Sequence, residues 1–206
     1  GIESEALYYV PLGKSHEVWA LSVTNRSDVQ RDLTLTGYAE FTNHSNYEQD
    51  QVNLQYSLFI SRTQFQSDRI IQQIHGNLDA LSEQEQIDEK NVTERFFGLS
   101  GANVSSYCGE KEHFLGKYHG YGDPQGIASG DLGNVTSYNE NSCGALSCIL
   151  SLAPGETRTV AYVLGAGGGS ESSAVLNTYT DQAEQTAREL AELKDDWQKK
   201  LDHLIV

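Results

Sequence analysis

The sequence has no long apolar run and few basic residues, and each shortage argues against a class of protein. No stretch reaches the roughly 18 uninterrupted apolar residues of a membrane helix. Residues 1–6 also lack the basic and then apolar segments of a secretion signal. Lysine and arginine total 14 against 29 aspartates and glutamates, which gives a formal charge of −15. Because this charge repels nucleic acid and anionic lipid, we expect neither as a partner.

The few cysteines and histidines do not form the pattern of a disulfide scaffold or a metal site. Cys108, Cys143 and Cys148 are irregularly spaced and form no C-x-x-C motif. No two of the six histidines have the i, i+4 spacing with an acid that is typical of a helical zinc site. We therefore expect reduced thiols, a cytoplasmic location, no metal and no cofactor.

Most of the chain alternates apolar and polar residues in runs of five to nine that are bounded by Gly, Asn and Asp. This period of two is typical of half-buried β-strands. It predicts strands at 7–11, 17–24, 32–41, 56–63, 69–74, 93–99, 145–152 and 157–164. Pro154 and Gly155 predict a type II turn that joins the last two as an antiparallel hairpin. The sequence therefore predicts an all-β, antiparallel domain over residues 1–165.

Near its C-terminus the chain changes to the period of a helix. Residues 166–180 are interpreted as a Gly/Ser-rich linker, and residues 181–206 as an amphipathic helix with Thr180 or Asp181 as its N-cap. The apolar stripe of this helix comprises Ala183, Ala187, Leu190, Leu193, Trp197, Leu201 and Leu204. We expect such a stripe to dock on the sandwich or on a following domain.

Between Ser82 and Asn141 the alternation weakens into a region rich in Gly, Ser and Tyr, and loops of that length are usually functional or packed on a neighbour. Tyrosines among Asn, Gln and Asp are suited to stacking on sugars, although such residues also serve as core and rim at a sandwich edge. The tyrosines in question are Tyr38, Tyr47, Tyr56, Tyr107, Tyr118 and Tyr121. His113 and His119 are further loop candidates for a sugar or phosphate contact.

A carboxylic acid is needed to protonate the leaving oxygen of a glycoside, but spacing selects none in this chain. The acids in loop-like stretches are Glu48, Asp50, Glu110, Glu112, Asp123 and Asp131. A nucleophile elbow and a phosphate-binding P-loop are absent as well. The sequence therefore predicts no catalytic residue.

Several segments resemble, in order and over nearly the whole chain, the glycoside hydrolase family 94 phosphorylases, which include cellobiose phosphorylase. These segments are GIESEALYYVPLG, EVWALSVTNRSD, DQVNLQ, FLGKYHGYGDPQGIASG, LAPGETRTVAYVLG and WQKKL. The resemblance implies an antiparallel supersandwich of the galactose mutarotase type with a C-terminal linker helix. It also implies that a following (α/α)6 barrel, absent from this sequence, carries the catalytic acid.

The same resemblance implies the reaction and its partners. The family consists of inverting phosphorylases, so inorganic phosphate is the expected co-substrate, a β-glucan oligosaccharide the expected substrate, and a homodimer the expected assembly. Asp50, Asn53 and Gln55 match a family motif, and Tyr56 stands where cellobiose-type members carry an arginine that holds the acceptor sugar. These four residues are the predicted substrate contacts. Replacing a fixed cation with a ring points away from simple cellobiose specificity.

Three functions remain open at this point. The first is a non-catalytic part of a phosphorylase that serves as scaffold, forms the dimer and shapes the acceptor subsite. The second is a free-standing carbohydrate-binding module, which the tyrosine-rich loops would permit. The third is one chain of a split phosphorylase, in which the apolar stripe of the helix would bind a separate barrel chain.

Overall fold

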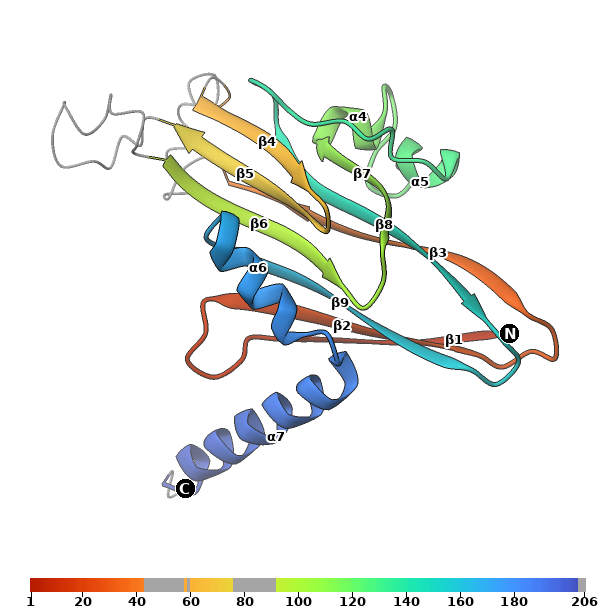
Figure 1. The fold of residues 1–206 in the computed structure, drawn as a ribbon, viewed down its shortest axis with the longest axis vertical. Helices are drawn as coiled ribbons and strands as arrows, with labels where there is room; N and C mark the ends of the chain where they lie inside the picture. Colours follow the sequence, from red (N-terminus) through yellow and green to blue (C-terminus); the bar gives the residue numbers. More distant parts are fainter. Residues whose placement is uncertain (43–57, 59, 76–91, 204–206) are drawn as a thin grey trace, which may run out of the picture.

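The structure, a computed structural model, describes residues 1–42, 58, 60–75 and 92–203 (Figure 1). One sheet has six strands in the spatial order β1 (Ile2–Tyr9), β2 (His16–Asn25), β9 (Thr157–Ala166), β6 (Val92–Ser100), β5 (Arg69–His75) and β4 (Ser61–Gln66). The other has three, in the order β3 (Arg31–Glu40), β8 (Ser142–Leu152) and β7 (Val104–Glu110). All pairings between these strands are antiparallel, which confirms the predicted all-β class.

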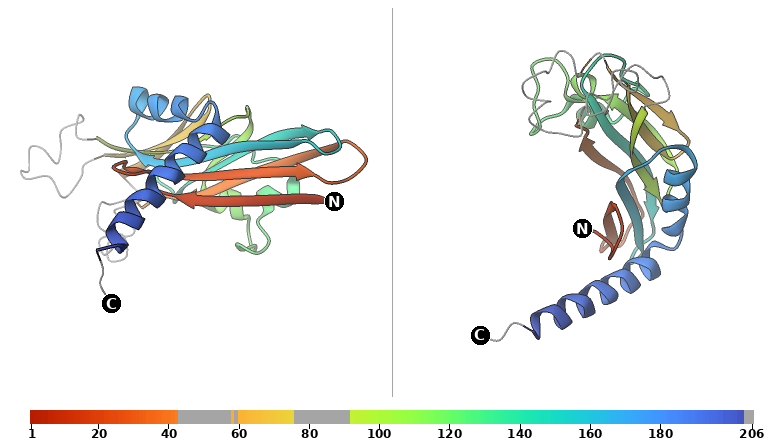
Figure 2. Two further views of the ribbon diagram at one scale, coloured as in Figure 1. Left: turned by 90° about the horizontal axis from the view of Figure 1, so that it is seen from below. Right: turned by 90° about the vertical axis from the view of Figure 1, so that its left-hand side faces the viewer.

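In the described part of the chain, four helices lie on the outer faces of the two sheets. Helices α4 (Lys111–Leu115) and α5 (Gln125–Ser129) lie against the three-stranded sheet. Helices α6 (Gly169–Thr178) and α7 (Gln182–Leu201) lie on the six-stranded sheet, and α7 then extends away from it (Figure 2). No helix in the described part of the chain is both long and apolar enough to cross a membrane.

The main core fills the space between the sheets. Its buried members are Ala39, Phe41, Ile70, Phe97, Leu99, Leu146, Cys148, Leu150, Val160 and Tyr162. Trp19 and Leu21 pack against this cluster from the predicted apolar face of β2. Gly37 is required here, because a Cβ at this position would lie 2.5 Å from the ring of Tyr162. The missing side chain lets the Tyr162 hydroxyl donate to the Leu35 carbonyl at 3.2 Å.

A smaller core lies on each outer face. Beneath α6 and α7 the six-stranded sheet buries Tyr9, Val18, Ile71, Phe96, Ala161 and Val163 together with Leu176 and Tyr179. Beneath α4 the three-stranded sheet buries Cys108, Cys143 and Ala145 with Phe114 and Leu132. Strand β8 is therefore buried on both faces over most of its length, and its sequence is a nearly continuous run of small and apolar residues.

Asn25 joins two of the turns that carry the chain between the sheets, the one after β2 and the one after β8. Its side-chain nitrogen donates to the carbonyls of Val29, Leu152 and Ala153 at 2.7, 3.0 and 3.2 Å. Its side-chain oxygen accepts from the Ser27 amide and hydroxyl. The side chain is fully buried, so these bonds replace water for carbonyls that have no strand partner.

The predicted turn at 153–156 is confirmed, but the predicted hairpin is wrong. Gly155 has φ of 76°, and the Glu156 amide donates to the Ala153 carbonyl at 3.0 Å, as in a type II turn. The flanking strands, however, belong to different sheets, since β8 pairs with β3 and β7 while β9 pairs with β2 and β6. A type II turn splays its two strands, unlike the primed turns that match the twist of a hairpin.

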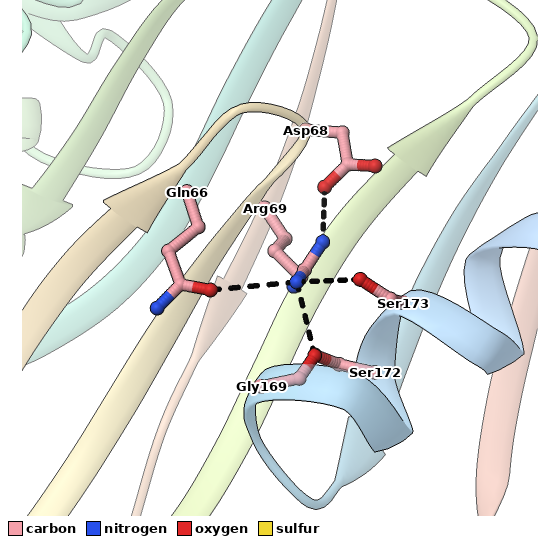
Figure 3. Close-up of polar contacts among 6 residues, drawn as sticks. All are labelled: Gln66, Asp68, Arg69, Gly169, Ser172 and Ser173. Atoms are coloured by element: carbon pink, nitrogen blue, oxygen red, sulfur yellow. Dashed lines mark hydrogen bonds and ion pairs between the residues drawn. The ribbon is translucent and has the colours of Figure 1, made fainter.

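Arg69 fastens helix α6 to the turn between β4 and β5 (Figure 3). Its guanidinium donates to the Gly169 carbonyl at 3.0 Å and to the Ser173 hydroxyl at 2.8 Å. It also pairs with Asp68 at 2.6 Å, and Arg69 is almost fully buried. Much of the stretch interpreted as a linker is thus a helix that is packed on the sheet.

Helix α7 begins as its sequence predicts, with the Asp181 side chain accepting from the Glu184 amide at 3.4 Å. Its docked face differs from the apolar stripe. Leu190 and Leu193 pack on the core below α6, but Trp197 is 55% and Leu201 51% exposed. The buried residues of the helix are polar: Gln182, Thr186 and Glu189.

The eight predicted strands correspond to observed ones, with β4 displaced toward Ser61–Gln66. Strand β7 was not predicted, because VSSYCGE has no regular alternation of apolar residues. Its two ends instead carry register shifts against β8. The strand is held by the Tyr107 ring, which stacks on Phe65 at 3.8 Å between ring centroids, a contact that only the tertiary fold creates.

We expect Asn25→Ala to lower the free energy of unfolding by about 3 kcal/mol, because a buried side chain loses its hydrogen bonds to three carbonyls and to Ser27. Urea denaturation of the chain measures this. Asn177→Ala, at an exposed position on α6, is the matched control and should change the free energy of unfolding by less than about 0.5 kcal/mol. Equal effects of the two substitutions would contradict the assigned role of Asn25.

Candidate functional site

A cavity of about 420 Å³ lies at the end of the sandwich opposite Asn25, where β2 begins and β3 and β9 end. Apolar atoms dominate its lining, which includes Val10, Phe41, Leu164 and Ala166. Charged and polar residues also line it, namely Lys14, His16, Glu17, Glu40 and Arg95. Its size, and an apolar wall with a few polar groups, are typical of a site for a small molecule such as a sugar.

Glu40 is held by three side chains. Its Oε1 accepts from the Tyr38 hydroxyl at 3.0 Å and from the Tyr121 hydroxyl, and its Oε2 pairs with Lys111 Nζ at 3.0 Å. Burial raises the pKa of Glu40, but the bonds from Tyr121, Lys111 and Tyr38 outweigh it and lower the pKa overall. The carboxylate is therefore a charged and fixed acceptor, suited to a sugar hydroxyl and unsuited to proton donation.

The predicted sugar-stacking tyrosines separate into two groups. Tyr38 stacks on Phe114 at 4.4 Å and Tyr107 on Phe65, so both rings serve packing. Tyr118 is fully exposed and Tyr121 is 62% exposed, and Tyr121 is tied to the cavity through Glu40. Tyr121 also lies beneath Lys111 Nζ, at 5.3 Å from its ring centroid. The exposed Tyr121 ring, beside a fixed carboxylate, can stack on a saccharide.

The loop histidines and acids mostly hold the loop together. His119 Nδ1 lies 2.9 Å from Asp123 Oδ2, and Asp131 accepts from the Gly133 amide at 2.9 Å. Glu112 accepts from Asn141 at 2.6 Å. Within the described ranges no group of three His, Cys, Asp or Glu residues could hold a metal ion.

The four predicted substrate contacts, Asp50, Asn53, Gln55 and Tyr56, lie outside the described residues, as do Tyr47 and Glu48. Their assignment stays a prediction. Thr42, the last described residue before this segment, lines the cavity.

Sequence reasoning missed Glu40, Arg95 and Glu17 as site residues, because strand patterns assign such charges to solvent. Arg95 donates to the Thr42 carbonyl at 3.2 Å and to Gln72 Oε1 at 3.3 Å, so it links β6 to the end of β3 and to β5. For Arg95 the sequence did contain one signal, because this charged residue directly precedes the buried pair Phe96 and Phe97.

Comparisons with known proteins give a consistent picture. Residues 1–195 match the sequence model of the glycosyl hydrolase 94 supersandwich domain. N,N'-diacetylchitobiose phosphorylases of Vibrio furnissii and Vibrio proteolyticus are each 28% identical over 201 residues, which is 97% of this chain. The chain spans 23% of the length of these curated relatives. A solved polysaccharide lyase aligns with a TM-score of 0.42 at 13% identity, over 82% of this chain and 20% of that one.

We expect Glu40→Gln to destabilise the chain at neutral pH and to have little effect in acid. A carboxyl with a lowered pKa in the folded state stabilises the fold above its ordinary value of 4.5, and this contribution is lost as pH falls through the lowered pKa. Urea midpoints at pH 7 and at steps below pH 4.5 measure the difference. Glu5→Gln, on the exposed part of β1, is the control and should show no such convergence.

Proposed function

This chain belongs to the glycosyl hydrolase 94 supersandwich family, and we propose that it is the supersandwich domain of an inverting β-glycoside phosphorylase. The observation that carries this proposal is the match of residues 1–195 to the family, together with alignment of 97% of the chain to two phosphorylases. The relatives are about four times longer, so the proposed activity belongs to a whole enzyme of which this chain is one part.

In the proposed reaction an oxygen of inorganic phosphate attacks the anomeric carbon of a β-glycoside. The bond from that carbon to the bridging oxygen breaks, and a carboxylic acid outside this chain protonates the departing oxygen. The products are a sugar 1-phosphate of inverted configuration and the released acceptor sugar. Glu40 does not serve as the acid in this proposal, because its lowered pKa keeps it ionised.

The role proposed for this chain is to shape the acceptor subsite. The cavity of about 420 Å³, the fixed carboxylate of Glu40 and the exposed Tyr118 and Tyr121 support this role. The motif residues Asp50, Asn53, Gln55 and Tyr56 are proposed as further contacts. No metal or organic cofactor is proposed for the chain, and inorganic phosphate is the co-substrate of the whole enzyme.

Two surfaces support the proposed partners. The exposed Trp197 and Leu201 on α7 offer an apolar strip to a following (α/α)6 barrel of the same enzyme. On and just after β1, Tyr8, Val10 and Leu12 are about half exposed, and an apolar patch of this kind suits a homodimer contact. We propose a cytoplasmic location, since all three cysteines are free and buried thiols.

The substrate proposed first is N,N'-diacetylchitobiose, which the names of both relatives specify for those proteins. A β-glucan oligosaccharide is the second candidate. It is favoured by Tyr56, which would stack on a sugar ring where cellobiose-type members hold the acceptor with an arginine. We expect Tyr56→Arg to improve the use of glucose as acceptor relative to N-acetylglucosamine.

The first test is phosphate-dependent cleavage of β-linked disaccharides by the full-length enzyme and by this chain alone. We expect sugar 1-phosphate to form from the full-length enzyme only. Turnover by the chain alone would contradict the placement of the acid elsewhere. Saccharide binding by the isolated chain, with no phosphorolysis by the full-length protein, would instead indicate a binding module. Activity that requires a separately encoded barrel chain would indicate a split enzyme.

Within the full-length enzyme we expect Tyr121→Ala to raise the KM for the acceptor sugar roughly tenfold, as expected for the loss of a stacking ring. The substitution should leave kcat nearly unchanged, since the ring is proposed to bind the acceptor equally in the ground state and the transition state. Initial rates of the synthetic reaction at varied acceptor concentration measure both constants. Tyr138→Ala removes a ring that is 70% exposed and is the matched control, expected to leave the KM unchanged.

A further inference from the structure

His16 stands between two cavities. It lines the cavity of about 420 Å³ described above and also a second one of about 690 Å³, between the β1–β2 connection and helices α6 and α7. Lys14 and Ser15 line both cavities as well. The segment that forms a wall of the candidate sugar site is thus also a wall of the space beside α7.

A chain of hydrogen bonds connects His16 to helix α7. His16 Nε2 lies 2.8 Å from the hydroxyl of Tyr179, which is fully buried between α6 and α7. The Tyr179 hydroxyl donates to Glu189 at 3.2 Å, and the same carboxylate accepts from Tyr9 at 2.8 Å and from Gln185 at 2.7 Å. Glu189 thus accepts from Tyr9 of β1, from Tyr179 after α6 and from its own helix, and Tyr179 extends the network to His16 of β2.

This network favours one tautomer of His16. The Tyr179 hydroxyl has one proton, and it donates that proton to Glu189. His16 must then donate from Nε2 to the Tyr179 oxygen, which leaves Nδ1 as the acceptor nitrogen of a neutral ring. A neutral imidazole held in this way can accept a hydrogen bond from a sugar hydroxyl.

The network also fixes how α7 lies on the sandwich. A buried carboxylate is costly unless its lone pairs are satisfied, and Glu189 is 7% exposed with three neutral donors in place of a cation. Helix α7 docks through Glu189, Thr186 and Gln182 while Trp197 and Leu201 remain exposed. Hydrogen bonds are directional, so this polar face sets one rotation of the helix, which apolar packing alone would not do.

We propose that Tyr179 and Glu189 are positioning residues that hold His16 in the wall of the 420 Å³ cavity, with Nδ1 accepting from a saccharide hydroxyl, so that sugar binding there depends on the docking of α7. The inference rests on the proposed function. It adds to that function Tyr179, which follows α6, and Glu189 of α7, neither of which lines this cavity. It assigns no bond-making role to His16, because the reaction centre lies outside this chain.

The surroundings of His16 give the proposal a pH dependence. Burial lowers the pKa of His16, Glu189 opposes this and Lys14 adds to it. The other ionisable groups around the two cavities are Glu17, Glu40 and Arg95 on one side and Tyr9, Tyr179, Arg188 and Glu192 on the other. The ring is therefore neutral above pH 6.5, and Nδ1 stops accepting as pH falls through the lowered pKa. Affinity for the acceptor should fall over the same range.

The test compares Tyr179→Phe with wild type in the full-length enzyme, because this substitution removes only the hydroxyl. We expect the acceptor KM at pH 7 to rise roughly tenfold with kcat changed less than about twofold, the pattern of lost ground-state binding. In wild type the acceptor KM should rise as the pH falls. We also expect the pH at which this rise occurs to differ in Tyr179→Phe. Tyr138→Phe is the control, with no change expected in KM or its pH profile, and thermal melting confirms that both variants are folded.

Hydrogen-exchange mass spectrometry provides a readout that does not depend on activity. Tyr179→Phe, and not Tyr138→Phe, should increase exchange in residues 10–17 and in 185–192. If the wild-type enzyme phosphorolyses a β-glycoside but Tyr179→Phe leaves KM, its pH profile and exchange unchanged, the inference is overturned. If no β-glycoside is phosphorolysed, the proposed function fails, and increased exchange would still support the coupling of α7 to His16.

Discussion

The arrangement of the two sheets depends on the hydrogen bonds of the Asn25 side-chain amide. The chain passes from one sheet to the other after β2 and again after β8, and Asn25 satisfies carbonyls of both connections at one buried point. Because both connections are tight, the sandwich is closed at this end. The 420 Å³ cavity lies at the other end, where β2 begins and β3 and β9 end.

Apolar packing supplies the bulk of the stabilisation but has little directional preference, and buried polar groups decide how the layers are oriented. Asn25 joins sheet to sheet, Arg69 joins α6 to the β4–β5 turn, and Glu189 joins α7 to β1 directly and to β2 through Tyr179. Each lies at a boundary between elements, and each has several partners. A full set of hydrogen bonds offsets the cost of burying such a group. Because these bonds are directional, they also fix the relative orientation of the elements that they join.

These buried polar contacts fix the elements that form the candidate site at one end of the molecule. Glu40 at the end of β3, Arg95 on β6 and His16 at the start of β2 line a partly apolar cavity. In the proposed enzyme the contribution of this domain is to present fixed acceptors and rings to the sugar. The link from His16 to Glu189 means that the position of α7 bears on that surface.

The sequence by itself determined the local structure. Alternation gave the strands, Pro154 and Gly155 gave the turn, Asp181 gave the start of α7, and ordered motifs indicated the family. These features depend on neighbours within a few residues, so a sequence window contains their cause.

Only the tertiary structure decided which strands share a sheet, that β7 is a strand, and that α7 docks by a polar face. It also decided that Tyr38 and Tyr107 pack while Tyr121 is exposed, and that Glu40, Arg95 and His16 share a cavity. The physical reason is that each of these outcomes depends on a contact between residues far apart in the chain, such as Tyr9 with Glu189, and no local pattern contains both partners.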